Sequence, residues 1–199
     1  MKFPFFSLKE YSLTVRMLSV SDAAMTAALG LFGPIFAIYL TEQIQTGNAL
    51  EVIGVGTSIY LFTRSLGQVP LAYLIDKIPG ERDDFYILLV GSLIGVVIPL
   101  LYILVTQPWH LFVIQFLFGV AGALTYPTWS AIFTRHIDKG KEGMEWGLYQ
   151  TMSDVAGAVA APVGAVIVSL YGFSIVLIFA SALAAVSTLF VILIRNDLR

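Results

Sequence analysis

The chain is built from blocks of about 20 consecutive apolar residues, and these blocks limit its fold more than any other feature. A helix of that length crosses the hydrocarbon core of a bilayer, which is about 30 Å thick. Because lipid offers the backbone no hydrogen-bond partners, unbroken apolar blocks this long must be helices. Only 12% of the residues are charged, about half the share usual in soluble domains. We therefore predict an all-α protein of the cell membrane, with the lipid bilayer as its solvent.

Six such blocks predict six transmembrane helices in one domain, residues 18–194. Their ranges are 18–40, 52–75, 85–105, 111–133, 146–168 and 173–194. Residues 1–17 are predicted to form an amphipathic segment at the cytoplasmic interface, and residues 195–199 a cytoplasmic tail. Met1 and the basic tail are typical of true chain ends, while the sequence leaves open whether the chain is a natural half-length protein or a fragment.

The positive charges predict which helix ends face the cytoplasm. The chain has 11 Lys and Arg residues, and all except Arg64 lie in the N-terminal segment, the second connection, the fourth connection or the tail. The connections after the first, third and fifth spans contain neither Lys nor Arg. Under the positive-inside rule, both termini and the even-numbered connections are therefore cytoplasmic.

Several function classes lose support from the residues themselves. The chain has no cysteine, which excludes disulfides, thiol catalysis and thiolate metal sites, and we expect neither a metal nor a cofactor. No phosphate-binding loop of the type that drives ATP-powered proteins is present. The net charge of −2 gives no support for nucleic-acid binding. A six-helix intramembrane serine protease needs a membrane-embedded His base, but His110 and His136 lie in predicted connections on opposite sides.

Polar and small residues recur at helical spacing on four of the six spans, which predicts that these four helices face protein or a cavity rather than lipid. The stripes comprise Asp22, Thr26, Gly30 and Gly33 in the first span; Thr57, Tyr60, Arg64 and Gly67 in the second; Gln115, Gly119, Gly122, Tyr126 and Trp129 in the fourth; and Gln150, Asp154, Gly157, Ala161 and Gly164 in the fifth. The third and sixth spans contain no ionisable residue and are predicted to face outward.

The second connection carries a recognisable pattern of charges and glycine. Asp76 and Lys77 are followed by Gly80 and Arg82, and Ala72 stands four residues before Asp76. This loop resembles the signature between the second and third helices of the major facilitator superfamily, which reads Gly, three residues, Asp, Arg or Lys, one residue, Gly, then basic residues. Here alanine replaces the leading Gly, the second Gly is displaced by one position, and one basic residue remains.

The fifth span strengthens the resemblance and the fourth departs from it. Gly157, Ala161, Pro162 and Gly164 are similar to the Gly-x-x-x-Gly-Pro packing motif in the fifth helix of the family's antiporters, with Ala161 in place of the second glycine. In the fourth span, the arginine frequent in the family is replaced by Gln115, so an arginine for proton relay is absent there.

The resemblance implies a fold and a mechanism. The chain would form one half of a major facilitator fold, built from two inverted three-helix repeats, whereas full members have twelve helices in two similar halves. In that family the first and fourth helices of a half line the cavity, the second and fifth gate it, and the third and sixth face lipid. The implied activity is gradient-driven transport of a small solute by alternating access, with the direction, including efflux, left open, and with a proton or cation as a potential coupling ion.

The resemblance and the charges together predict a homodimer of half-transporters. Arg64 lies roughly 16 Å from the cytoplasmic end of its span, where an unpaired arginine costs about 2.5–3.5 kcal/mol on insertion scales. Asp154 has a similar predicted depth, so the two residues are candidates for transport or gating, either as a pair within one chain or between chains. A purely structural ion pair remains open. A third alternative function is a non-transporting membrane partner or assembly factor, which the absent arginine at Gln115 supports.

The remaining candidate residues have a functional and a simpler interpretation. Asp22 is a candidate transport acid, but Ser19 three residues before it also fits a capping box at a solvated helix end. Asp76 could interact with a neighbouring helix N-terminus or be a solvated loop acid. Asp83 and Asp84 are interpreted as a solvated acidic turn. The residues predicted to line the cavity are Thr26, Gln115, Tyr126, Trp129 and Gln150.

Overall fold

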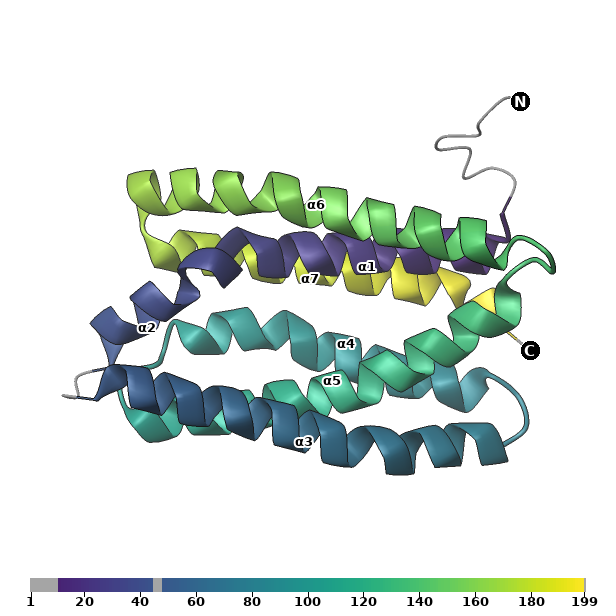
Figure 1. Ribbon diagram of the computed structural model, residues 1–199, viewed down its shortest axis with the longest axis horizontal. Helices are drawn as coiled ribbons and strands as arrows, with labels where there is room; N and C mark the ends of the chain where they lie inside the picture. Colours follow the sequence, from purple (N-terminus) through teal and green to yellow (C-terminus); the bar gives the residue numbers. More distant parts are fainter. Residues whose placement is uncertain (1–10, 45–47, 199) are drawn as a thin grey trace.

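A computed structural model of the chain describes residues 11–44 and 48–198, and α-helices make up almost all of this part (Figure 1). Most of the predicted amphipathic N-terminal segment lies outside the described residues. The elements are α1 (Leu13–Phe32), η2 (Gly33–Ile35), α2 (Phe36–Gln43), α3 (Ala49–Lys77), α4 (Arg82–Tyr102), α5 (Pro108–His136), α6 (Glu142–Tyr171), α7 (Phe173–Leu193) and η3 (Ile194–Asn196).

The long helices fall into two groups that lie side by side (Figure 1). In one group α1 packs against α6 and α7, and in the other α5 packs against α3 and α4. Packing of α4 against α7 joins the two groups. The start of α1, the α3–α4 and α5–α6 connections and the end of α7 all lie at the same end of the bundle (Figure 1). Every second connection therefore returns to the same end, as membrane-crossing helices require.

Five segments within the described residues are long and apolar enough to cross a bilayer by length and composition. They are Leu13–Gln43, Arg82–Tyr102, Pro108–His136, Glu142–Tyr171 and Phe173–Asn196. The predicted second span falls in α3, which has sufficient length at 29 residues but is not apolar enough to join them. Its charged residues, Glu51, Arg64, Asp76 and Lys77, lower its hydropathy. The helices also extend beyond most of the predicted spans, because the capping and charged residues at their ends remain helical.

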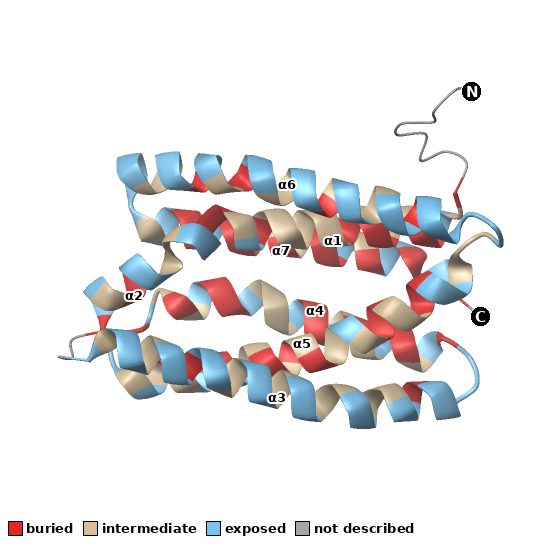
Figure 2. Ribbon diagram, viewed as in Figure 1, coloured by how far each residue is buried: buried red, intermediate tan, exposed pale blue. Residues whose placement is uncertain are grey.

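Two hydrophobic clusters hold the bundle together near its two ends. One centres on the aromatic residues Phe32, Tyr39 and Tyr102, with Tyr39 Oη donating a hydrogen bond to the Tyr102 carbonyl at 3.0 Å. The other centres on Trp129 and Phe133, whose rings stack with centroids 4.7 Å apart. Buried residues concentrate between the two groups of helices, whereas α3 and α6 are exposed along much of their length (Figure 2). The middle of the bundle, between the clusters, is therefore the region available for polar residues.

Glycines allow the closest helix contacts. A Cβ at Gly164 of α6 would overlap the carbonyl oxygen of Leu31 in α1, and one at Gly30 would lie 3.1 Å from the Gly157 carbonyl oxygen. In the other group, a Cβ at Gly119 of α5 would lie 2.8 Å from the Tyr60 carbonyl oxygen of α3. Since apolar burial does not drive helices together in lipid, such close backbone packing is a principal source of association.

The start of α1 corrects one interpretation made from the sequence. The N-cap is Ser12, whose Oγ accepts a hydrogen bond from the Val15 backbone N–H at 3.2 Å. Ser19 lies inside the helix, and its hydroxyl donates to the Val15 carbonyl at 2.8 Å. The capping box at Ser19 and Asp22 is therefore wrong, because the helix begins at Leu13 and Asp22 lies midway along it.

Candidate functional site

A layer of small hydroxyl side chains crosses the bundle between the two hydrophobic clusters. The layer consists of Ser21 in α1, Ser92 in α4, Thr125 in α5 and Ser187 in α7. The Ser21 and Ser187 hydroxyl oxygens are 3.0 Å apart, within hydrogen-bond distance, and thereby join α1 to α7. The third and sixth spans, α4 and α7, expose apolar side chains such as Val90 and Leu189, and their inner faces contribute hydroxyls to this layer, which the sequence does not predict.

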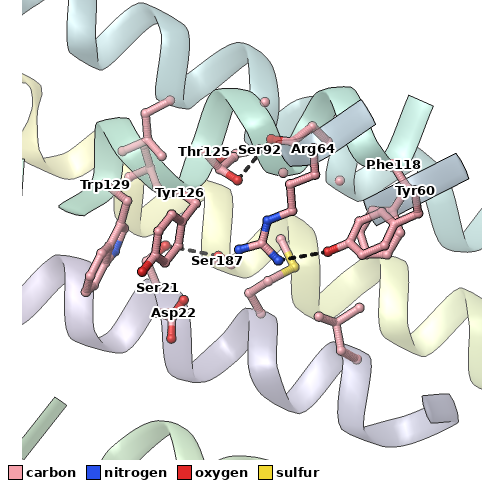
Figure 3. Close-up of a pocket in the computed structure, with 18 of the residues that line it drawn as sticks. Ser21, Asp22, Tyr60, Arg64, Ser92, Phe118, Thr125, Tyr126, Trp129 and Ser187 are labelled. Atoms are coloured by element: carbon pink, nitrogen blue, oxygen red, sulfur yellow. Dashed lines mark hydrogen bonds between the residues drawn. The ribbon is translucent and has the colours of Figure 1, made fainter. Parts of the chain in front are cut away.

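A cavity of about 230 Å³ opens at this layer (Figure 3). Aromatic residues form much of its wall: Tyr60, Phe118, Tyr126, Trp129 and Tyr149. The rings of Tyr60 and Phe118 stack with centroids 4.7 Å apart, and those of Trp129 and Tyr149 also lie 4.7 Å apart. The cavity has the character of a small-molecule site, since it combines aromatic walls with a few polar groups.

Arg64 is the cation of this cavity, and its guanidinium lies between Tyr60 and Tyr126 (Figure 3). Nη1 donates a hydrogen bond to Tyr60 Oη at 3.1 Å, and Cζ lies 5.1 Å from the centre of the Tyr126 ring, a cation–π distance. A Cβ at Gly122 would lie 3.1 Å from Arg64 Cδ, so this glycine provides the room in which the arginine lies against α5. Tyr60 and Gly122 thus fix the arginine in the cavity.

Asp22 is the acid of the same cavity. It accepts a hydrogen bond from Ser153 Oγ of α6 at 2.9 Å, which also fastens α1 to α6. No ion pair joins Asp22 to Arg64 at 4.0 Å or less within the described residues. The cavity therefore presents one positive and one negative group that do not neutralise each other by direct contact.

The predicted cavity residues are distributed over more than one environment. Tyr126 and Trp129 line the cavity with Arg64 and Asp22. Gln115 is instead buried farther along α5, where its Cγ would lie 3.4 Å from a Cβ placed at Gly56.

The remaining polar residues of the first and fifth spans follow α1 and α6. Thr26 lies at the contact between these helices, with its Cγ2 3.2 Å from a Cβ placed at Gly157. Gly157 and Gly164 also face this contact, whereas Pro162 is exposed.

Asp154 and Gln150 lie on the exposed surface of α6, where Gln150 Nε2 donates a hydrogen bond to Asp154 Oδ1 at 2.9 Å. The helices that carry Arg64 and Asp154, α3 and α6, lie on opposite sides of the bundle (Figure 1). The ion pairs of the described residues do not include one between these two side chains. The structure thus keeps the predicted charge pair apart within one chain.

A separate charged cluster lies where the α3–α4 connection meets the end of α5. Asp84 has no exposed side-chain surface and forms an ion pair with Arg135, whose side chain is 35% exposed. Glu81 Oε1 lies 3.6 Å from His136 Nδ1 in the same cluster. The interpretation of Asp84 as part of a solvated turn is therefore wrong. The residues that line a neighbouring pocket include Asp76, Gly80 and Arg135.

The buried Asp84–Arg135 pair makes an asymmetric stability prediction. Removing one member of a buried pair costs about 3–5 kcal/mol, but a charge that reaches water loses less. Arg135→Gln leaves the fully buried Asp84 carboxylate unpaired, so we expect a loss near the lower end of that range, about 3 kcal/mol. Asp84→Asn leaves a partly exposed arginine, and we expect about half that loss. Thermal unfolding in detergent measures both, and an equal loss in the two variants would contradict the explanation.

The polar stripes predict neither the hydroxyl layer nor two residues of α6 that shape the site. Tyr149 lines the cavity and Ser153 holds Asp22, and both project from α6 toward α1. They are four residues apart, so they share a helix face, and this spacing was the available signal. The neighbouring face, with Gln150 and Asp154, contains more polar residues and therefore dominates the pattern in the sequence.

Comparisons with known proteins agree with this architecture. The profile of the Major Facilitator Superfamily matches residues 18–199. The multidrug resistance protein MdtG of Dickeya zeae (strain Ech586) is 26% identical over 177 residues, which cover 88% of this chain and 42% of that protein. The multi-drug resistance efflux pump PmrA of Streptococcus pneumoniae serotype 4 (strain ATCC BAA-334 / TIGR4) is 27% identical over 158 residues, which cover 79% of this chain and 39% of that pump.

A solved structure shows the same fold at lower identity. The crystal structure of the POT family transporter PepTSo superposes with a TM-score of 0.74 at 15% identity, covering 92% of this chain and 37% of that one. The chain thus spans about two fifths of the length of the relatives it matches. Since the family profile covers nearly the whole chain, this multi-pass helical protein belongs to the Major Facilitator Superfamily.

Proposed function

We propose that the chain is one half of a secondary transporter that moves a small solute across the cell membrane by alternating access. The observation that carries this proposal is the aromatic cavity with Arg64 and Asp22 at the middle of a bundle of apolar helices. Ionisable residues at such depth in a membrane protein usually serve a solute or ion pathway, because burying them there without a function is costly.

The names of two relatives support export as the direction of transport in this proposal. MdtG is named as a multidrug resistance protein and PmrA as a multi-drug efflux pump. We propose that this chain likewise exports small organic solutes from the cytoplasm. Asp22 is the proposed site of the coupling proton, because it is the acid that shares the cavity with Arg64 and can exchange a proton as the solute binds.

The second half of the transporter is proposed to be a second copy of this chain. The helices α3 and α6 expose large apolar side chains such as Leu66, Val69 and Val159, which a partner half would cover. The resemblance assigns these two helices to the contact between halves. Six spans bring the chain back to the side where it started, so two copies inserted alike have the parallel relation of the family's halves.

Solute flux tests this proposal directly. The full chain is reconstituted in proteoliposomes, and a proton gradient, acidic inside, is expected to drive accumulation of a small aromatic solute that does not cross lipid unaided, such as naphthalene-2-sulfonate. The oligomeric mass in nanodiscs is expected to be that of two chains. A monodisperse monomer that transports at full rate would reject the homodimer. Dimers that bind solutes without moving them would favour the non-transporting partner.

Orientation gives a second prediction, since the chain has no native cysteine to remove. Single cysteines at Asn48 and Ser169, which are exposed at one end of the bundle, should react with an impermeant thiol reagent added outside intact cells. A cysteine at Lys139, exposed at the other end, should react only after the membrane is permeabilised. Labelling of Lys139→Cys in intact cells would invert the proposed topology, with both termini then outside.

A further inference from the structure

We propose that the cavity binds solutes with an anionic head group on an aromatic or apolar body, and that Arg64 is the ligand of the head group. This inference rests on the proposed function only for the statement that the bound molecule is transported. The binding chemistry follows from the cavity itself, and it names a substrate class that neither the fold nor the family specifies.

The hydrogen-bonding capacity of Arg64 is largely unused. A guanidinium carries five N–H donors in a planar fork. Within residues 11–44 and 48–198, the hydrogen bond recorded for this group is the one from Nη1 to Tyr60 Oη, and Nε is buried without an acceptor. Its charge also has no carboxylate within 4.0 Å in that part of the chain. A carboxylate, phosphonate or sulfonate supplies the acceptors that the planar fork fits best.

The arginine is held ready for such a ligand rather than loosely placed. Tyr60 fixes one side of the guanidinium, the Tyr126 ring covers it at 5.1 Å, and Gly122 leaves space for its stem. A side chain fixed in this way loses little conformational freedom when a ligand binds, and the gain in affinity is correspondingly larger.

The walls define the rest of the ligand. Tyr60, Phe118 and Trp129 line a cavity of about 230 Å³. Flat aromatic or compact apolar groups fill such space with favourable stacking. Amphipathic molecules with one anionic end match both features, whereas a cationic amphiphile would place its charge in a cavity that already contains an arginine.

Asp22 shapes the affinity because its charge, when present, repels an anion in the same cavity. Its carboxylate is engaged by Ser153 on the α6 side and does not ion-pair with Arg64. Removing this acid should therefore strengthen the binding of an anion, while removing the arginine should abolish the preference for one. This opposite response distinguishes a head-group ligand from a general structural role.

Three probes with the same ring system test the inference: 2-naphthoate, 2-naphthamide and 2-naphthylmethylammonium. Binding to the full chain in nanodiscs is measured by isothermal titration calorimetry, without transport. We expect naphthoate to bind at least about tenfold more tightly than naphthamide, as a charge-assisted hydrogen bond implies. Preference for the ammonium probe, equal binding of all three, or binding of none would each overturn the inference.

Variants assign the preference to Arg64. Arg64→Gln should bring naphthoate to the affinity of naphthamide, and Arg64→Lys should keep part of the difference, since it retains the charge without the fork. Asp22→Asn should tighten naphthoate binding several-fold. The matched control Arg195→Gln removes one positive charge from the exposed C-terminal end and should leave all three affinities unchanged. If the carboxylate preference survives in a folded Arg64→Gln protein, Arg64 is not the ligand.

The two proposals fail in different ways. An Arg64-dependent carboxylate preference in a protein that moves no solute would reject transport and sustain the inference. Transport of the ammonium probe, with naphthoate unbound, would sustain transport and reject the inference.

Discussion

Gly164→Ala is expected to destabilise the bundle strongly, although the change adds only one methyl group. A Cβ at this position would overlap the carbonyl oxygen of Leu31 in α1. Backbone atoms cannot move aside as the end of a flexible side chain can, so α1 and α6 must separate. We expect a loss of about 3 kcal/mol or more, at the upper end of the range for overpacked cores. In detergent, the variant should lose its monodisperse size-exclusion peak and unfold at a lower temperature.

The expected loss of stability is opposite to the gain that helix propensity alone predicts for this substitution, so the experiment separates the two effects. Alanine favours a helix interior over glycine by about 1 kcal/mol, so an uncrowded site would gain stability. Gly147→Ala on the same helix is the matched control, because a Cβ there meets nothing within 4 Å. We expect this control to be neutral or slightly stabilising. A Gly164→Ala protein as stable as the control would show that the close contact between α1 and α6 does not exist in the membrane.

The helices could be predicted from the sequence because lipid leaves an apolar block only one way to satisfy its backbone. The same argument explains why α3 does not have the composition of a lipid-facing span. Its charged residues make it the least lipid-like helix, and the sequence alone indicates that it needs protein neighbours. The neighbouring helix is α5. Gly119 of α5 packs against the Tyr60 carbonyl of α3, and Gly67 of α3 packs against Ala123 of α5.

The sequence predicts several residues that line the site, but it does not predict which side chains contact one another. The polar stripes of the first, second and fourth spans contain Asp22, Arg64, Tyr126 and Trp129, and these four residues line one cavity. The capping interpretation of Asp22 failed because the start of the helix was placed five residues too late, and an error of one turn or more converts an embedded acid into an interfacial one.

Pairing between distant helices is beyond what one sequence specifies. Asp84 and Arg135 are 51 positions apart, and their contact depends on the relative rotation and depth of α4 and α5. Periodicity fixes which residues share a face of one helix, but it does not fix the register between two helices. For this reason the sequence predicts a loop acid at Asp84 and a cavity residue at Gln115, whereas Asp84 is buried in an ion pair and Gln115 is buried beside Gly56.

Arg64→Ala is expected to lower solute flux at least about tenfold, which corresponds to the loss of one charge-assisted interaction. Arg64 has no ion-pair partner within the described part of its own chain, and Asp154 is exposed on α6 at the opposite side of the bundle. In the proposed parallel homodimer, α3 of one copy packs beside α6 of the other. If Arg64 of one copy meets Asp154 of the other at this contact, twofold symmetry forms the pair a second time. A pair formed between copies would close the gate, and the head group of the solute would replace the Asp154 carboxylate as the gate opens.

Charge exchange tests this pair separately from the binding site. Arg64→Asp places two acids at the contact between copies and Asp154→Arg two bases, so each single variant should weaken the dimer through like-charge repulsion. The double variant restores opposite charges, and we expect it to recover the dimer mass in nanodiscs and a higher flux than either single variant. Flux should stay below that of the natural chain, because the arginine has left the cavity. Arg64→Cys and Asp154→Cys in one chain should be joined between chains by a short bis-maleimide reagent, since an Arg–Asp pair spans more than the Cα–Cα separation of about 4.4–6.8 Å that a disulfide bridges. If the double variant is as monomeric as the single ones and the cysteines do not cross-link, then Arg64 and Asp154 do not meet between copies, and the gate must be formed by other residues of α3 and α6.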